Sequence, residues 1–180
     1  MKILIFTEGT IIMHDLAKDV NRKERVKQSQ EARIQQFVKK ILPFKTSLGS
    51  VYDLESYVPI GNAVEKLKSW KSQGAEIVYL TSRRIQSEVE TIQSVLKKYH
   101  FPQCQNLYFR LRGEDYKDIA ERLRPDIIIE DDCESIGGEK EMTYPHIKEE
   151  LKSKIKSIVV KEFEGIERLP DNVKLLKQYE

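Results

Sequence analysis

The stretch "PIGNAVEKLKSWKSQGAEIVYLTSR", residues 59–83, decides the fold. Its first part predicts an amphipathic helix that ends at Gly74, because glycine adopts the positive backbone φ angle of a helix C-cap. Its second part, residues 76–82, is a mostly apolar run that ends in polar residues, as a buried strand does. A helix that leads directly into a buried strand is the repeating unit of a parallel sheet. The apolar face of the helix consists of Ala63, Val64, Leu67 and Trp70.

The same alternation continues on both sides of this stretch. Strands connected by helices of this length imply right-handed crossovers and a parallel sheet that is covered on both faces. We therefore expect an α/β fold, a three-layer Rossmann-like arrangement, in a single domain that spans residues 1–180. Besides 76–82, strands are expected at 2–6, 106–111, 126–132 and 156–160, and helices at 83–101, 114–123 and 172–178.

A basic segment separates the first strand from the rest of the pattern. Residues 17–45 predict a helix that ends near Pro43, and they carry nine Lys or Arg against three Asp or Glu. The segment is either a solvated face around a packed apolar stripe or a surface that draws an anionic ligand toward a site. The stripe has helical spacing and consists of Ile34, Phe37, Val38, Ile41 and Leu42.

Composition argues against several functional classes. The net charge of +2 does not indicate a nucleic-acid or membrane partner, and no apolar run approaches the length of a bilayer span. The amino terminus lacks the pattern of a secretory signal, and the two cysteines, Cys104 and Cys133, have no disulfide or metal-binding spacing. We expect a cytoplasmic protein without a membrane partner, and the sequence leaves its oligomeric state open.

Candidate functional residues follow three of the predicted strands. Ligands of an open parallel sheet bind outside the carboxyl ends of its strands. Hydroxyl groups beside exposed backbone N–H groups suit a phosphate, and clustered carboxylates suit a hard cation such as Mg²⁺. Lys117, near the start of a later helix, can reach the same edge. The residues at the strand ends are Thr7, Glu8, Gly9 and Thr10, then Thr81, Ser82 and Arg83, and then Glu130, Asp131 and Asp132.

This order of residues resembles the haloacid dehalogenase-like superfamily of phosphohydrolases. Residues 6–10, "FTEGT", are similar to the family's first motif, D-x-D-G-T after an apolar strand. Thr81 corresponds to the hydroxyl residue of the second motif, Lys117 to the lysine of the third, and residues 130–132 contain the acidic pair of the fourth. Residues 11–56 stand where the family inserts a cap, so the resemblance implies a small helical cap after the first strand.

The resemblance implies a Mg²⁺-dependent phosphatase site whose ligand is phosphate or a small phosphorylated metabolite. Carried over residue by residue, it gives catalytic roles to Glu8 and Lys117. Together with the strand-end positions of Ser82 and Arg83, it gives phosphate or substrate binding to Thr10, Thr81, Ser82, Arg83 and Lys117. It gives metal binding to Glu8, Glu130, Asp131 and Asp132.

The sequence departs from the family at the attacking residue. Phe6 stands where the family's first aspartate forms a phosphoenzyme, and its ring has neither a nucleophilic atom nor a metal-binding oxygen. The usual covalent route therefore cannot run on this side chain. A water held by a metal ion on Glu8, Asp131 and Asp132 is our hypothesis for a replacement nucleophile.

Three functions remain open at this stage. The first is a metal-dependent phosphohydrolase that acts by this altered mechanism. The second is a binding or regulatory protein whose degenerate active site keeps a phosphate-and-cation pocket but has lost turnover. The third is a nucleic-acid enzyme, because Glu8-Gly9 and Glu130-x-Asp132 loosely resemble the magnesium-binding acids of the Toprim fold. Their separation is long for Toprim, and residues 59–83 fit the phosphohydrolase pattern better, so nucleic acid is the least favoured partner.

Overall fold

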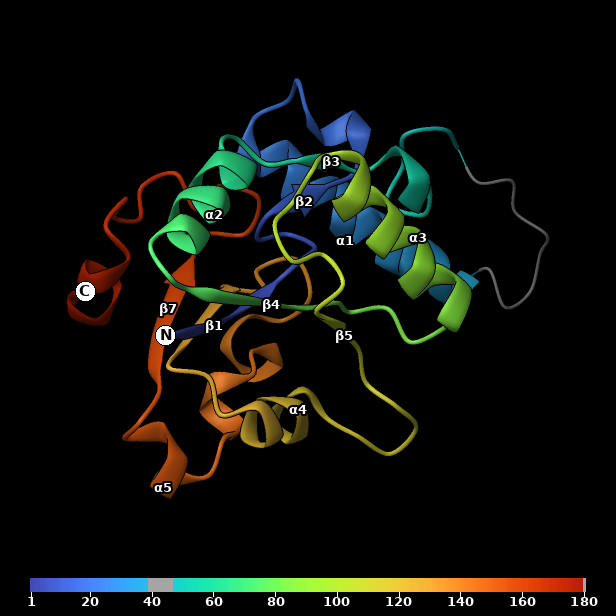
Figure 1. Ribbon diagram of the computed structural model, residues 1–180. Helices are drawn as coiled ribbons and strands as arrows, with labels where there is room; N and C mark the ends of the chain where they lie inside the picture. The colour runs from blue at the N-terminus through green and yellow to red at the C-terminus, as the bar shows by residue number, and fades with distance from the viewer. Residues whose placement is uncertain (39–46, 180) are drawn as a thin grey trace.

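The computed structural model describes residues 1–38 and 47–179. Its core is a five-stranded sheet in which every neighbouring pair of strands is parallel (Figure 1). The spatial order is β5-β4-β1-β6-β7, so the chain extends the sheet on one side of β1 and then on the other. Such a reversal opens a crevice at the carboxyl end of the central strand. The strands are β1 (Lys2–Phe6), β4 (Glu76–Leu80), β5 (Leu107–Tyr108), β6 (Ile127–Asp131) and β7 (Lys156–Val160).

Helices cover both faces of the sheet, which confirms the predicted three-layer α/β fold. Figure 1 shows α2 (Ala63–Ser72) on one side of the sheet and α4 (Tyr116–Leu123) and α5 (Glu149–Lys152) on the other. Alternate β1 residues point to opposite faces, so Ile3 and Ile5 pack with α2 and α3 (Gln86–Lys98), whereas Leu4 packs with α4. In the part of the chain that the structure describes, no helix is long and apolar enough to span a membrane.

Two predicted elements are shorter than the sequence indicated. The strand expected at 106–111 contains only the two residues of β5, which lies at the edge of the sheet. The carboxyl-terminal helix expected at 172–178 is the 3₁₀ helix η5 (Val173–Gln178). Its Val173 and Leu176 are buried in the same core as α2.

The segment after β1 contains β2 (Ile12–Met13), η1 (Asp15–Ala17), α1 (Arg22–Val38) and η2 (Leu54–Ser56). β2 pairs antiparallel with β3 (Val58–Pro59). The start and the end of the segment between β1 and α2 therefore lie side by side.

The helix expected at 17–45 begins at Arg22 rather than at residue 17. Its apolar stripe also differs from the prediction, because Ile34 is 65% exposed while Val26 and Ala32 are buried. The predicted stripe residues Ile41 and Leu42 lie outside the described residues.

Candidate active site

The carboxyl ends of β1, β4 and β6 open into a cavity of about 760 Å³. The turn after β1 approaches the neighbouring strands closely because residue 9 is a glycine with φ of +82°. A Cβ atom at this position would lie 2.9 Å from Asp131 Oδ2 and 3.3 Å from Glu162 Cγ. The missing side chain thus lets the turn lie directly against two acidic residues from β6 and from the loop after β7.

The Glu8 carboxylate accepts hydrogen bonds from the polar residues that follow β4. Its Oε1 accepts hydrogen bonds from Thr81 Oγ1 at 2.6 Å and from Arg83 Nε at 3.2 Å. Its Oε2 accepts from Ser82 N at 3.1 Å and from Thr7 Oγ1 at 2.6 Å.

The carboxyl group of Glu8 is held as an anion. Burial alone would raise its pKa, but the charge of Arg83 and the hydrogen bonds from Thr7, Thr81 and Ser82 hold the pKa below its usual value. We call Thr81 Oγ1, Ser82 N and Arg83 Nε the anion-donor group. Because these donors bind the Glu8 carboxylate, they are already arranged around an anion.

Asp131 and Glu162 form a pair of buried carboxyl groups beside the β1 turn. Asp131 accepts from Thr10 Oγ1 at 2.9 Å and from Cys133 N at 3.0 Å. Glu162 accepts from Ser135 N and Ser135 Oγ, each at 2.7 Å. Burial raises the pKa of Asp131 to about 6 and that of Glu162 to about 7, and the charge of Asp131 adds to the shift of Glu162.

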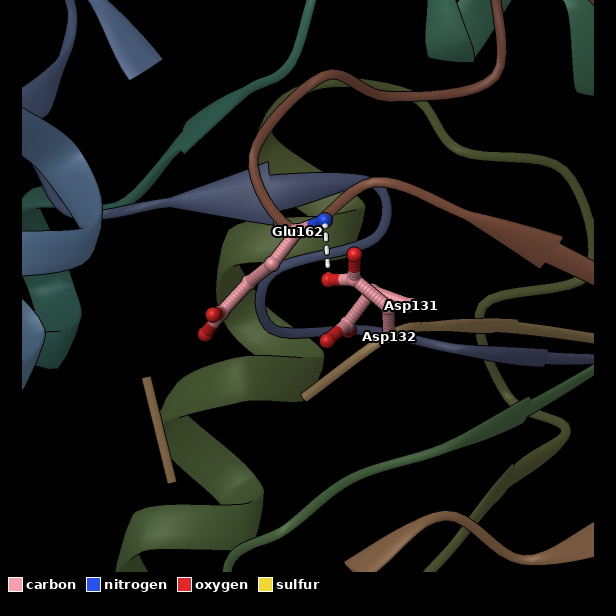
Figure 2. Close-up of side chains that lie close together, drawn as sticks. All are labelled: Asp131, Asp132 and Glu162. Carbon is pink, nitrogen blue, oxygen red and sulfur yellow. Dashed lines mark hydrogen bonds between the residues drawn. The ribbon is translucent and has the colours of Figure 1, made fainter. Parts of the chain in front are cut away.

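Figure 2 shows Asp131 and Glu162 together with Asp132 at the ends of β6 and β7. One oxygen of each carboxyl group lies within 4.8 Å of the others. Asp132 is already neutralised, because it accepts from Lys161 Nζ at 2.9 Å and lies 3.6 Å from the Arg22 guanidinium. Burial would raise the pKa of Asp132, but these partners and the Glu162 backbone N–H lower it.

Asp131 and Glu162, by contrast, have only neutral hydrogen-bond donors among the described residues. Two buried carboxyl groups side by side favour either a shared cation or bound protons, and their oxygens are the ligands that Mg²⁺ takes. The carboxylate oxygens of Asp131 and Glu162 therefore fit a divalent cation. Glu130 also has neutral donors, the backbone N–H groups of Thr143 and Tyr144 at 2.7 and 2.9 Å, and burial raises its pKa. It lines the same cavity but lies outside this group.

The remaining predicted residues line the same cavity with other partners. The ring of Phe6 packs edge-on against Tyr116, with 5.3 Å between ring centroids. Lys117 Nζ lies 3.4 Å from Asp118 Oδ1, and Lys117 also lines the cavity.

The structure thus brings Glu8 together with Thr81, Ser82 and Arg83, and Asp131 together with Thr10, in two adjacent groups. Glu8 and Asp131 do not share one cluster in the described chain, so the predicted metal role of Glu8 stays a prediction. Glu162 was missed by the sequence analysis. It follows the apolar strand "KSIVV" at the same edge, so extending the strand-end rule to β7 would have found it.

Replacing Gly9 with alanine should destabilise the protein by about 3 kcal/mol, because backbone strain at a positive φ angle adds to a contact with Asp131. Gly74→Ala is a matched control, since Gly74 has φ of +91° and nothing beyond its chain neighbours lies within 4 Å of the place that a Cβ would take. It should lose only about 1 kcal/mol. Urea unfolding measures both variants, and equal losses would show that the close approach at Gly9 is unimportant.

The solved structures to which the chain is similar include those of an acid phosphatase and of a hydrolase. The class C acid phosphatase from Bacillus anthracis matches with a TM-score of 0.53 and 11% identity, covering 98% of this chain and 77% of that chain. The same enzyme with tungstate bound gives 0.52 and 10%, with the same coverage. A HAD family hydrolase from Deinococcus radiodurans R1, with bound phosphate and sodium, gives 0.45 and 12%, covering 90% and 91%.

No protein-family model matches the chain, and no curated protein does. The likeness to the acid phosphatase extends over nearly the whole chain, and at this identity it concerns the fold. The chain therefore shares the α/β fold of that phosphatase, with a five-stranded parallel sheet between helices.

Proposed function

We propose that this protein is a metal-dependent hydrolase of a small phosphorylated molecule, with water in the place of a side-chain nucleophile. One observation carries the proposal: the buried acid pair, Asp131 and Glu162, lines the same cavity as Glu8, Ser82 and Arg83. The cavity therefore combines a place for a cation with donors that already bind an anion.

Each group in the cavity has a distinct role in this proposal. A phosphate binds to the anion-donor group. Glu8 rotates away from these donors to the acid–base position that the family resemblance implies. Asp131 and Glu162 hold Mg²⁺, and Thr10 and Ser135 fix the two carboxyl groups through the hydrogen bonds described above. When bound, the ion supplies charge neutralisation and an acidified water.

We further propose that residues 11–56 act as a small cap over this cavity. Helix α1 contributes Ser29, Ala32 and Arg33 to the cavity lining. Its arginines hold it against the loops that follow β6 and β7: Arg33 donates to Ile136 O at 2.6 Å, and Arg25 donates to Phe163 O at 2.8 Å.

A panel of phosphomonoesters with Mg²⁺ or Mn²⁺ tests the hydrolase. We expect Asp131→Asn and Glu162→Gln to lower phosphate release by about a hundredfold or more, because each removes one carboxylate from the proposed metal site. Glu139→Gln is the control, since this exposed acid is outside the cavity. Phosphate release at the parent rate by the two site variants would contradict the proposal.

A second candidate is a binding protein without turnover. Two observations favour it: Phe6 supplies no nucleophile, and Glu8 occupies the anion-donor group. In this case phosphate or a phosphorylated metabolite stabilises the protein against heat, but no ester of the panel is hydrolysed.

A further inference from the structure

One wall of the cavity carries positive charge that the neighbouring acids balance poorly. Arg83 is paired with Glu8, but Arg84 has no ion pair among the described residues. Arg110 lines the same cavity, and the nearest carboxylate in an ion pair with it is that of Asp115, at 4.0 Å and largely exposed. This wall therefore attracts an anion from outside the protein.

Arg110 is held in place by Tyr116, but one of its N–H groups has no partner among the described residues. Its guanidinium lies 3.6 Å from the centroid of the Tyr116 ring, and Phe6 packs edge-on against the same ring. The Arg110 side chain is only 15% exposed, and its buried Nε has no hydrogen-bond partner in the described part of the chain. A buried N–H without a partner costs free energy, so a shift of this side chain that lets a ligand oxygen bind the N–H is favourable.

The position of Arg110 relates it to the anion-donor group. Thr81 N donates to Tyr108 O at 3.0 Å, so Arg110 lies two residues beyond the point where β5 pairs with the end of β4. Both groups thus lie at the same edge of the sheet and face one cavity. At about 760 Å³, that cavity has the size of a metabolite site rather than that of a single phosphate.

We propose that the ligand carries a second anionic group, a carboxylate or another phosphate, and that Arg110 binds it. The proposal rests on the proposed function, which gives the first phosphate to the anion-donor group. A planar guanidinium that is stacked on an aromatic ring offers two parallel N–H groups to an oxyanion, which makes Arg110 a specificity-determining residue.

Two matched ligand pairs test this by calorimetry. 3-Phosphoglycerate and glycerol 3-phosphate differ by a carboxylate, and fructose 1,6-bisphosphate and fructose 6-phosphate differ by a phosphate. The parent should bind the doubly anionic member of one pair at least about tenfold more tightly, and the pair that shows the preference identifies the second group. Arg110→Met should abolish the preference. Arg110→Lys keeps the positive charge but loses the two parallel N–H groups, so it should retain part of the preference.

Arg112→Met is the matched control, because Arg112 is exposed and does not line the cavity. It should keep the preference of the parent. Equal affinity within both pairs in the parent, or a preference that survives in Arg110→Met, would overturn the inference while leaving phosphate binding intact. If no ester binds the parent, this inference and the proposed function both fail. If the preference is present but no ester is hydrolysed, only the hydrolase fails.

Discussion

Replacing Phe6 with aspartate should raise phosphatase activity at least about a hundredfold above that of the parent, in the presence of Mg²⁺. Phe6 is the last residue of β1 and pairs in register with Leu80. It lines the same cavity as Arg83 and packs against Tyr116. A carboxylate there supplies the attacking oxygen that the family resemblance places at this position. Phosphate release from a panel of monoesters measures the gain.

Phe6→Asn is the control for this gain. It has almost the shape of the aspartate and disturbs the packing on Tyr116 equally, but its amide is not a nucleophile. The activity of Phe6→Asp should disappear when a chelator removes the metal. The added carboxylate increases the negative charge of a cavity that Glu130 and Asp131 also line, and a cation is needed to offset this charge against the phosphate. If the two variants have equal activity, the cavity differs from a phosphohydrolase site by more than its attacking residue.

The sheet could be predicted from the sequence because its strands bury both faces. Runs such as "ILIF" in β1 and "IIIED" in β6 have no polar alternation, and that pattern requires a parallel sheet between two helical layers. The limits of β5 and α1 could not be predicted in the same way. An edge strand of two residues has little apolar pattern, and the burial of α1 depends on the loops that its arginines contact rather than on its own spacing.

The sequence predicted which residues lie at the site, because their positions at strand ends place them there. It did not predict which of these side chains contact one another. The strand-end rule located Glu8, Thr81 and Asp131, but it could not show that Glu8 bonds to Thr81 while Asp131 joins Asp132 and Glu162. The position of the Glu8 carboxylate depends on its ion pair with Arg83, which follows β4. The importance of Arg110 depends on its stacking against Tyr116, which no spacing in the sequence reveals.

Glu162→Gln should stabilise the protein by up to about 3 kcal/mol at pH 8 and leave its stability nearly unchanged at pH 4. The pKa of Glu162 is about 7 in the folded protein, against an ordinary value of 4.5, a difference of 7 − 4.5 = 2.5 units at about 1.4 kcal/mol each. Because the folded pKa is raised, the contribution of Glu162 to stability is fully present below pH 4.5 and is lost as the pH rises through 7.

Above that range the parent keeps a buried charge beside Asp131, whereas glutamine carries none and can still accept one hydrogen bond from Ser135. Urea unfolding between pH 4 and pH 8 measures the difference, with the exposed Glu164→Gln as the control. Mg²⁺ should restore the stability of the parent at pH 8 but not raise that of Glu162→Gln, because only the parent presents both carboxylates to a cation. A stability gain that is equal at both pH values would mean that Glu162 titrates as an ordinary surface acid, and the buried pair would then give no reason to expect a metal.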